Sequence, residues 1–521
     1  MNATNLRVLA ISALLATGLT ACGGGGGGHR EPLGEGASGQ FAQQCAPDNK
    51  LARDNAGRLL KDYREGTRLT ELSFVHAYLQ ENYLWYDEVP MLSPDLPAYR
   101  QVGYQEGMTN WFKAQLSSKL NPDGLRRDRF SFAMPTAEWT AQSRTGAPST
   151  YGMDIGILRQ EVPRDLRVVL VMPDTPAARQ RVSRGDRLLS VVTPAGKRID
   201  VVNTQDPADL DVLMQILFQA RDGEEAQFEF DPAAEDGEQR RTVALSAGQY
   251  QAPPVQAAHV LSTATGGKVG YLMFNGFNLA TEAQLIKAVT DMKAQNVSDV
   301  VVDLRYNGGG YLYQSAELAY MLSDSTLSRG KVFERLKYND KRKKEESQLP
   351  FIAVASGNEG TETKANQALP SLGLRRVYVL TGINTCSASE SLINGLRGID
   401  VEVIQVGSTT CGKPYGFTAH DNCGMSYFPI EFNGVNDKGA GGFDAGFSPT
   451  CFVADDLQHQ LGSAQEALLA TALFHREHGR CPVAGEAQIK RAVDQVSGAA
   501  SHAAGPMLMR TPAQTSSFLL P

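Results

Sequence analysis

Residues 377–406 have the sequence VYVLTGINTCSASESLINGLRGIDVEVIQV. The apolar runs at the two ends of this stretch, 377–381 and 401–406, are typical of buried β-strands. Between them, apolar residues recur at the spacing of one helix face from Ala388 to Leu396. The order strand, helix, strand predicts a β-α-β unit with parallel strands.

The same alternation occurs earlier in the chain. Val269–Phe274 and Val300–Leu304 are strand-like apolar runs. Thr281–Gln295 and Tyr313–Leu322 have apolar residues at helical spacing. Repeated units of this kind are typical of an α/β fold, and we expect this core to occupy residues 255–485.

The polar stretch after the first of these paired strands carries a candidate nucleophile, Ser387, at the start of the predicted helix. Helix N–H groups and the helix dipole favour negative charge at such a position. A serine needs a base, and the nearest histidine is the distant His420. Lys413, 413 − 387 = 26 residues later, follows the next strand and can act as base if burial lowers its pKa. Glu390, one helical turn after Ser387, is placed to orient both groups.

Structural roles for the same residues stay open. Ser387 and Glu390 also fit a helix-capping box, in which a serine caps the helix and a glutamate three residues on returns the hydrogen bond. The three glycines at 308–310 also fit a turn without a catalytic role.

Residues 149–250 form a separate β-rich region. It contains four strand-like runs and one helical pattern: Met153–Leu158, Arg167–Met172, Arg187–Val192, Ala226–Phe230 and the helix Asp209–Phe218. This region resembles a PDZ domain, including a Gly-Asp turn at 185–186 that leads into the third strand.

The loop and strand that begin at Gly152 resemble the site where a PDZ domain holds a peptide. In such a site backbone N–H groups bind the terminal carboxylate and the strand edge pairs with the peptide. The resemblance implies that Gly152, Met153, Ile155 and Gly156 bind peptide. A small β-rich domain that binds nothing is the alternative.

A third motif, Asp303-Leu304-Arg305-Tyr306-Asn307-Gly308-Gly309-Gly310, directly follows a predicted strand. Together with Ser387-Ala388-Ser389-Glu390 and the pair Gly412-Lys413, it resembles the C-terminal processing (tail-specific) protease family. The order of all three motifs matches that family.

The resemblance implies a crotonase-like protease core of ββα units, with a small helical N-terminal region and an inserted PDZ-like domain. It implies Ser387 as nucleophile and Lys413 as base. It also implies an oxyanion hole made by backbone N–H groups of Gly309, Gly310 and Ala388.

The chain departs from the family pattern in two places. Thr385 stands two residues before the nucleophile, where a second serine is common. Gly398 stands where some members have an aspartate, and Asp400 is near that position without matching it. The sequence therefore leaves the third catalytic group open.

The first 21 residues are typical of a signal peptide, with Arg7 ahead of an apolar run too short to span a bilayer. Leu19-Thr20-Ala21-Cys22 resembles a bacterial lipobox, which implies acylation of Cys22 and a membrane anchor. Gly23–Gly28 predicts a flexible tether. We expect the outer membrane and the periplasmic face, with the cell surface or a soluble, unacylated protein as alternatives.

Three further segments complete the expected organisation: a Gly-rich tether at 22–60, a helical region at 61–148 and a disordered tail at 495–521. The chain ends in the apolar residues Ser517–Pro521. We expect the PDZ-like domain to bind this end, as a self-inhibitor or a self-processing site.

Charge and cysteine content narrow the function classes. The net charge of −7 gives no sign of nucleic-acid binding. Six cysteines follow Cys22, and an exported chain can join them in disulfides. Cys411 and Cys423 flank a predicted hairpin and are the first pair that we expect. Neither the cysteines nor the histidines have metal-ligand spacing, so we expect no metal and no cofactor.

We therefore expect a serine endopeptidase that cuts exported, unfolded or C-terminally tagged proteins. A binding protein built on the same fold is one alternative, and an acyl-thioester enzyme of the crotonase type is another. The expected partners are protein or peptide substrates and a membrane. The oligomeric state and the natural substrates stay open.

Overall fold

The computed structural model describes residues 37–54, 56–121, 124–145, 149–233, 239–250, 253–263, 266–357, 363–483, 505–508 and 517–518. The predicted signal peptide, the Cys22 anchor and the glycine run lie outside these residues. Within them, no helix has both the length and the apolar character that crossing a bilayer requires.

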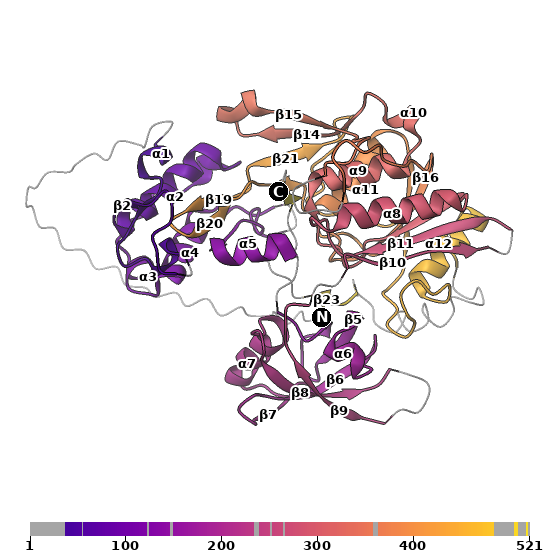
Figure 1. Ribbon diagram of the computed structural model, residues 1–521, viewed down its shortest axis with the longest axis horizontal. Coiled ribbons are helices and arrows are strands. Elements are labelled where there is room, and N and C mark those ends of the chain that lie inside the picture. Colours follow the sequence, from indigo (N-terminus) through magenta and orange to yellow (C-terminus); the bar gives the residue numbers. More distant parts are fainter. Residues whose placement is uncertain are drawn as a thin grey trace, which may run out of the picture. The chain divides into compact units, whose positions relative to one another are not determined.

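The core is a six-stranded sheet with the strand order β10-β11-β12-β16-β17-β22 (Figure 1). Neighbouring strands are parallel, except for the antiparallel pair β10 and β11. The strands are Val255–Ser262 (β10), Lys268–Phe274 (β11), Asp299–Asp303 (β12), Arg376–Thr381 (β16), Glu402–Gly407 (β17) and Cys451–Phe452 (β22). The predicted α/β core is confirmed.

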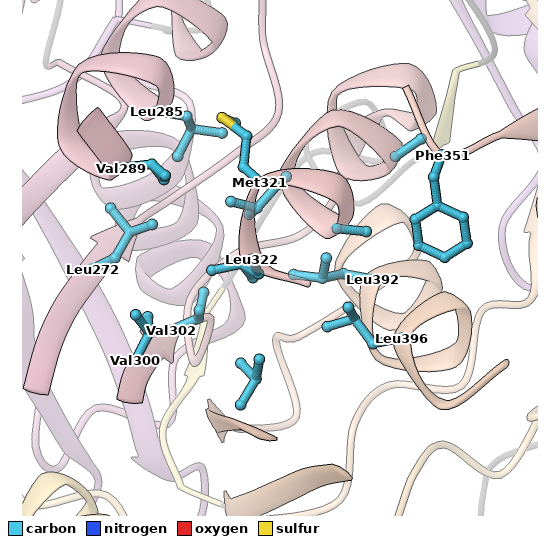
Figure 2. Packing of buried hydrophobic residues seen from close by; sticks show 14 of the residues in the cluster. Leu272, Leu285, Val289, Val300, Val302, Met321, Leu322, Phe351, Leu392 and Leu396 are labelled. Atoms are coloured by element: carbon cyan, nitrogen blue, oxygen red, sulfur yellow. The ribbon is translucent and has the colours of Figure 1, made fainter. Parts of the chain in front are cut away.

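Helices pack on both faces of this sheet. One face carries Thr281–Ala294 (α8), Leu312–Leu322 (α9) and Ala388–Gly398 (α11), and the other carries Ala467–His478 (α12). Side chains along β12 alternate between the two layers. Val300 and Val302 pack among α8, α9 and α11 (Figure 2), whereas Val301 packs with residues of α12. Both faces of the strand are buried, which explains its continuous apolar sequence.

A second sheet forms the PDZ-like region, in the order β23-β4-β5-β6-β8-β9 with β7 beside β6. Its elements are Met153–Arg159 (β4), Asp165–Val171 (β5), Pro176–Arg179 (α6), Arg187–Val192 (β6), Arg198–Asp200 (β7), Pro207–Phe218 (α7), Glu225–Asp231 (β8), Arg241–Ser246 (β9) and Met507–Leu508 (β23). Leu213 and Ile216 of α7 pack in one cluster with Phe228 and Phe230 of β8. Every predicted strand of this region is present, and β23 is an addition from the C-terminal tail.

The N-terminal region consists of short helices and strands. They are Ser38–Phe41 (α1), Gln44–Cys45 (β1), Arg64–Glu65 (β2), Arg68–Asn82 (α2), Pro97–Arg100 (α3), Tyr104–Gln115 (α4), Phe132–Pro135 (β3) and Thr136–Thr145 (α5), with 3₁₀ turns at Lys50–Ala52 and Tyr86–Glu88. Phe74 of α2 and Phe112 of α4 pack with Tyr427, far along the chain. Regular structure starts before residue 60, where the sequence predicts the end of the tether. The buried Glu71 accepts the Ala46 N–H at 2.6 Å and helps to fix this segment.

Two smaller sheets have the orders β15-β14-β21-β18 and β19-β20-β3, and the second includes β3 of the N-terminal region. Their remaining elements are Val332–Tyr338 (β14), Ser347–Pro350 (β15), Tyr415–Gly416 (β18), His420–Asn422 (β19), Met425–Phe428 (β20) and Phe432–Val435 (β21). Ser325–Ser328 (α10) and a 3₁₀ turn at Asp340–Glu345 lie near β14 in sequence, and Gly310–Tyr311 (β13) pairs with Ser517–Phe518 (β24).

Three disulfides join Cys45 to Cys423, Cys386 to Cys411, and Cys451 to Cys481. The expected pair Cys411–Cys423 is therefore wrong. Cys386 and Cys411 follow the carboxyl ends of the adjacent parallel strands β16 and β17, and so they meet at one edge of the sheet. Cys423 lies in the turn of the β19–β20 hairpin, where it meets the N-terminal segment instead.

Candidate active site

Ser387 lies between the end of β16 and the first turn of α11. It has a φ of 63° and a ψ of −116°, a conformation that costs energy in a residue with a side chain. Such strain persists only where the surroundings fix the backbone, and it is most frequent at functional sites. Ser387 is buried at the N-terminal end of α11, where helix N–H groups have no partner within the helix.

The glycine turn after β12 packs directly against Ser387. Gly309 has a φ of 110°, and a Cβ placed on it would lie 2.8 Å from the Cβ of Ser387. The carbonyl of Asn307 accepts the Cys386 N–H and the Ser389 hydroxyl, both at 3.1 Å. Only glycine fits this close approach, and Asn307 fixes the turn to the loop that carries the serine.

The N–H groups of the glycine turn have different partners. The Gly309 N–H donates to Asn307 Oδ1 at 2.9 Å, inside the turn itself. Phe277 pairs with one edge of the segment from Gly309 to Tyr311. Its N–H donates to Gly309 O, and its carbonyl accepts the Tyr311 N–H. Of the three predicted oxyanion donors, Gly309 therefore has its N–H engaged within the turn, whereas Ala388 opens α11.

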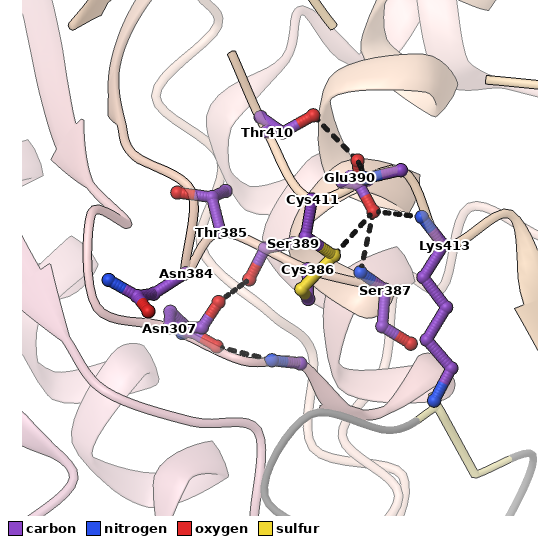
Figure 3. The surroundings of a disulfide bond; sticks show 12 residues. Asn307, Asn384, Thr385, Cys386, Ser387, Ser389, Glu390, Thr410, Cys411 and Lys413 are labelled. Atoms are coloured by element: carbon purple, nitrogen blue, oxygen red, sulfur yellow. Dashed lines mark hydrogen bonds between the residues drawn. A yellow bond between two sulfur atoms is a disulfide. The ribbon is translucent and has the colours of Figure 1, made fainter. Parts of the chain in front are cut away.

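The carboxylate of Glu390 connects the serine loop to the lysine loop (Figure 3). One oxygen accepts the Thr410 hydroxyl at 2.6 Å and the Gly412 N–H at 2.9 Å. The other accepts the N–H groups of Ser387 at 3.0 Å and Lys413 at 2.8 Å. Burial raises the pKa of Glu390, and these hydrogen bonds act in the opposite direction. The capping role and the orienting role predicted for Glu390 are compatible, since it holds both backbones.

Lys413 is fully buried beside two aromatic rings. Its Nζ lies 4.6 Å from the ring centre of Phe417 and 5.1 Å from that of Phe130. Burial lowers the pKa of Lys413 from 10.5 to about 7, against the opposing effect of the carboxylates of Asp128 and Glu390. In Figure 3 the side chains of Ser387 and Lys413 extend to the same side of Glu390. Because the pKa of Lys413 is about 7, a substantial fraction of its amine is neutral near pH 7.

Arg129 supports the lysine loop, a role that the sequence gave no reason to expect. Its Nη2 donates to the carbonyl oxygens of Cys411, Gly412 and Asp444, each at 3.2 Å. Gly412 has a φ of 78°, and a Cβ there would lie 2.1 Å from the carbonyl oxygen of Asp444. The loop is thus fixed from both sides.

The charged residues of the glycine-turn motif form a buried ion network. Arg305 binds both Asp303, at 2.9 Å, and Glu466 of the α12 N-terminus, at 2.7 Å. It also binds Asp455 at 2.9 Å, and Arg184 of the PDZ-like region binds the same carboxylate at 2.7 Å. The motif's aspartate and arginine therefore hold the turn in place and link it to the PDZ-like region.

The positions that depart from the family pattern have structural partners. The Thr385 hydroxyl donates to Leu304 O at 2.8 Å and so joins the serine loop to the end of β12. Asp400 is exposed and pairs with Lys438. Among the described carboxylates, Glu390 is the one that contacts the backbones of both Ser387 and Lys413.

The predicted peptide-binding residues lie at and before β4. Met153, Ile155 and Gly156 are strand residues, and Gly152, with a φ of 90°, forms the preceding turn. Met153 and Ile155 point into the apolar cluster of this region. Their contribution to a ligand is therefore through the backbone, as strand addition requires.

The strained serine, the buried lysine and the bridging carboxylate all lie in the part of the chain that resembles a known peptidase family. Residues 268–421 match the model for peptidase family S41. The matched residues lie within the α/β core, and the match agrees with the predicted resemblance to C-terminal processing proteases.

Individual relatives are distant. The "Probable CtpA-like serine protease" of Staphylococcus epidermidis is 24% identical over 319 residues, covering 60% of this chain and 55% of that protein. A carboxyl-terminal-processing protease of Picosynechococcus sp. is 26% identical over 197 residues, covering 37% of this chain and 44% of that protein. The chain thus spans about half the length of these relatives.

The same fold occurs in a solved S41-type structure from Bacteroides fragilis. That structure is 23% identical, covers 81% of this chain and 99% of its own, and has a TM-score of 0.59.

Proposed function

We propose that this chain is a serine endopeptidase in which Ser387 is the nucleophile and Lys413 the general base. The observation that carries the proposal is the Glu390 carboxylate, which accepts N–H groups from both residues and fixes their loops together. The low pKa of Lys413, about 7, supports it, because only a neutral amine can accept a proton.

In the first half of the reaction, Ser387 Oγ attacks the carbonyl carbon of the scissile peptide bond and its proton passes to Lys413 Nζ. The N–H groups of Gly310 and Ala388 stabilise the negative oxygen of the tetrahedral intermediate. The C–N bond then breaks, and the leaving amine takes the proton from the Lys413 ammonium. An ester between Ser387 and the substrate's acyl group remains.

In the second half, water attacks the ester and gives a proton to Lys413. The ester C–O bond breaks, Ser387 Oγ takes that proton back, and the substrate leaves as a carboxylic acid. Lys413 is thus protonated and deprotonated once in each half of the reaction.

Substrates are proposed to be unfolded or C-terminally tagged exported proteins, held by the edge of β4. Backbone pairing gives affinity for an extended peptide, and pockets for alternate side chains add a preference for its sequence. Export, and a lipid anchor at Cys22 facing the periplasm, belong to the same proposal. The three disulfides support it, since such bonds persist in oxidising compartments.

The test is cleavage of an unfolded reporter protein by the chain from residue 29 onward. We expect fragments of the reporter, and about tenfold higher kcat/KM when it ends in apolar residues than when it ends in charged ones. Mass spectrometry of the fragments gives the bonds that are cut. If the folded chain cuts no reporter at any pH, a peptide-binding role on the same fold replaces the proposal.

The disulfide between Cys386 and Cys411 gives a second prediction. It joins the residue before Ser387 to the residue two before Lys413. Replacing both cysteines by serine is expected to lower kcat by about 10-fold to 100-fold with little change in KM, because small displacements of reacting groups are costly.

The matched control is the double serine variant of Cys451 and Cys481, a pair that joins the end of the sheet to the chain after α12. This variant should keep its kcat. Equal losses in both variants would show a general effect on stability instead of a positioning effect, and a shifted pH profile in the first variant alone would support positioning.

A further inference from the structure

The C-terminal tail adds a strand to the PDZ-like sheet. Residues Met507 and Leu508 (β23) pair antiparallel with Ile157 and Gly156 of β4. β4 is the strand that the sequence predicts to pair with peptides, and antiparallel addition to its edge is how such strands bind ligands. The edge is therefore occupied by the chain's own residues.

The tail packs closely on β4. A Cβ placed on Gly156 would lie 2.5 Å from the Cβ of Pro506 and 2.6 Å from a methyl carbon of Val169, so the missing side chain makes room for both residues. Leu508 is 8% exposed and packs in the apolar cluster that includes Val169 and Tyr306, whereas its neighbour Met507 is 39% exposed. One face of the tail is thus buried and the other faces solvent.

Asn384 holds the same segment from the serine loop. Its side-chain Nδ2 donates to the Pro506 carbonyl at 2.9 Å, and its Oδ1 accepts the Leu508 N–H at 3.1 Å. A neighbouring β-strand would make the same two kinds of bond, one donated and one accepted. Asn384 therefore recognises the backbone of the tail and not its side chains. Asn384 lies three residues before Ser387, which connects tail binding to the catalytic loop.

A second piece of the tail lies in the catalytic site. Ser517–Phe518 (β24) pairs in parallel with Gly310–Tyr311 (β13), on the edge opposite Phe277. β24 also contacts β18, which begins two residues after Lys413. The backbone of 517–518 therefore pairs with the proposed oxyanion donor Gly310 and contacts the strand that follows Lys413.

We propose that the C-terminal segment is a built-in ligand that occupies the β4 edge through 505–508 and the edge of the glycine turn beside Ser387 through 517–518. A peptide offered from outside must displace it, so the tail inhibits the chain in cis. Because the tail is tethered, its effective concentration reaches the millimolar range, and even modest affinity keeps the site occupied. The inhibitory consequence rests on the proposed function, whereas the occupancy does not.

The binding test uses the peptide GPMLMRTPAQTSSFLLP, the sequence of residues 505–521, with a fluorescent label. It is offered to full chains that all carry Ser387→Ala, so that no cleavage interferes, and binding is followed by anisotropy. Leu508→Asp puts a charge on the buried side of the tail and should release it, tightening peptide binding by about tenfold or more. Met507→Asp makes the same change on the exposed side and should bind peptide as weakly as the parent.

Equal peptide affinity in all three chains, with folding intact, overturns the inference. If Leu508→Asp does not fold, a chain that ends at residue 504 replaces it with the same expectation. With Ser387 restored, Leu508→Asp should also raise kcat/KM for the reporter by about tenfold, and Met507→Asp should not. Absence of cleavage in every chain, together with the expected binding difference, would refute the peptidase function and leave tail occupancy standing.

Discussion

Replacing Ser387 by alanine is expected to lower kcat/KM for the unfolded reporter by about 10⁴-fold or more, because no other group can form the acyl-enzyme. The fold should survive the change. The φ of 63° at this position strains alanine and serine alike, since both carry a Cβ. The Glu390 carboxylate accepts the backbone N–H of residue 387 and keeps that bond in the variant.

Ser391 provides the matched control. It lies one turn further along α11 and is also largely buried, so Ser391→Ala makes the same chemical change away from the proposed reaction. We expect this variant to keep its activity within about threefold, because the Ser391 hydroxyl bonds the buried Glu334 and is not placed in the proposed reaction; any loss should be one of stability. Ser387→Ala should still bind the reporter, and a serine-reactive phosphonate should label the parent at Ser387 only. Cleavage that persists in Ser387→Ala would mean that another residue is the nucleophile.

The sequence predicts the α/β core because the core depends on local periodicity. Val300–Leu304 is apolar at every position because both of its faces are buried, and this pattern can be recognised without knowing its neighbours. The Ser387 and Lys413 positions follow from the same local logic. Each comes just after a parallel strand, and the carboxyl ends of adjacent parallel strands lie at the same edge of the sheet.

Contacts between distant segments could not be predicted in this way. Arg129 is 282 residues from Cys411, whose carbonyl it binds, and nothing local to Arg129 marks it as part of the site. The disulfide partner of Cys423 lies 378 residues away, so the hairpin around Cys423 suggested a nearer partner. Spacing along the chain identifies residue types, but only the packed fold selects their partners.

The tail illustrates the same limit in another form. The sequence predicts that the PDZ-like domain binds the chain end at 517–521, and for residues 517–518 this prediction is wrong. In the structure residues 507–508 pair with β4 of that domain, and 517–518 pair beside the catalytic turn. The carbonyl of Pro506, the missing side chain of Gly156 and the Asn384 amide select the register, and none of these is visible as apolar character.

Lys413 should give the activity a distinctive pH dependence. Its pKa of about 7 means that the neutral, proton-accepting form grows tenfold per pH unit below that value and saturates above it. We expect log kcat/KM to rise with unit slope up to about pH 7 and then to level off. Lys413→Met keeps an unbranched apolar stem but no base, and should lower kcat/KM by about 10⁴-fold at every pH.

Measurements of folding stability distinguish the role of Lys413 as a base from a structural role. Its pKa is lower in the folded state, at about 7, than the ordinary 10.5 that applies when the chain unfolds. The unfolded state therefore binds more protons between these two pKa values. The resulting loss in the free energy of unfolding is fully present below about pH 7 and disappears as the pH approaches 10.5. Lys413→Met should accordingly be more stable than the parent at low pH, with the difference closing as pH rises, in urea midpoints measured across that range.

Lys413→Arg is the informative counterpart, because it keeps a charge that cannot be given up. It should be inactive like the methionine variant but less stable than the parent, since a permanent cation is buried beside Phe130 and Phe417. Opposite stability changes with equal losses of activity would show that catalysis depends on a removable proton and not on the bulk or charge of residue 413. A parent profile that is flat through pH 7, or a methionine variant less stable than the parent at low pH, would instead assign Lys413 a structural role and leave Ser387 without an identified base.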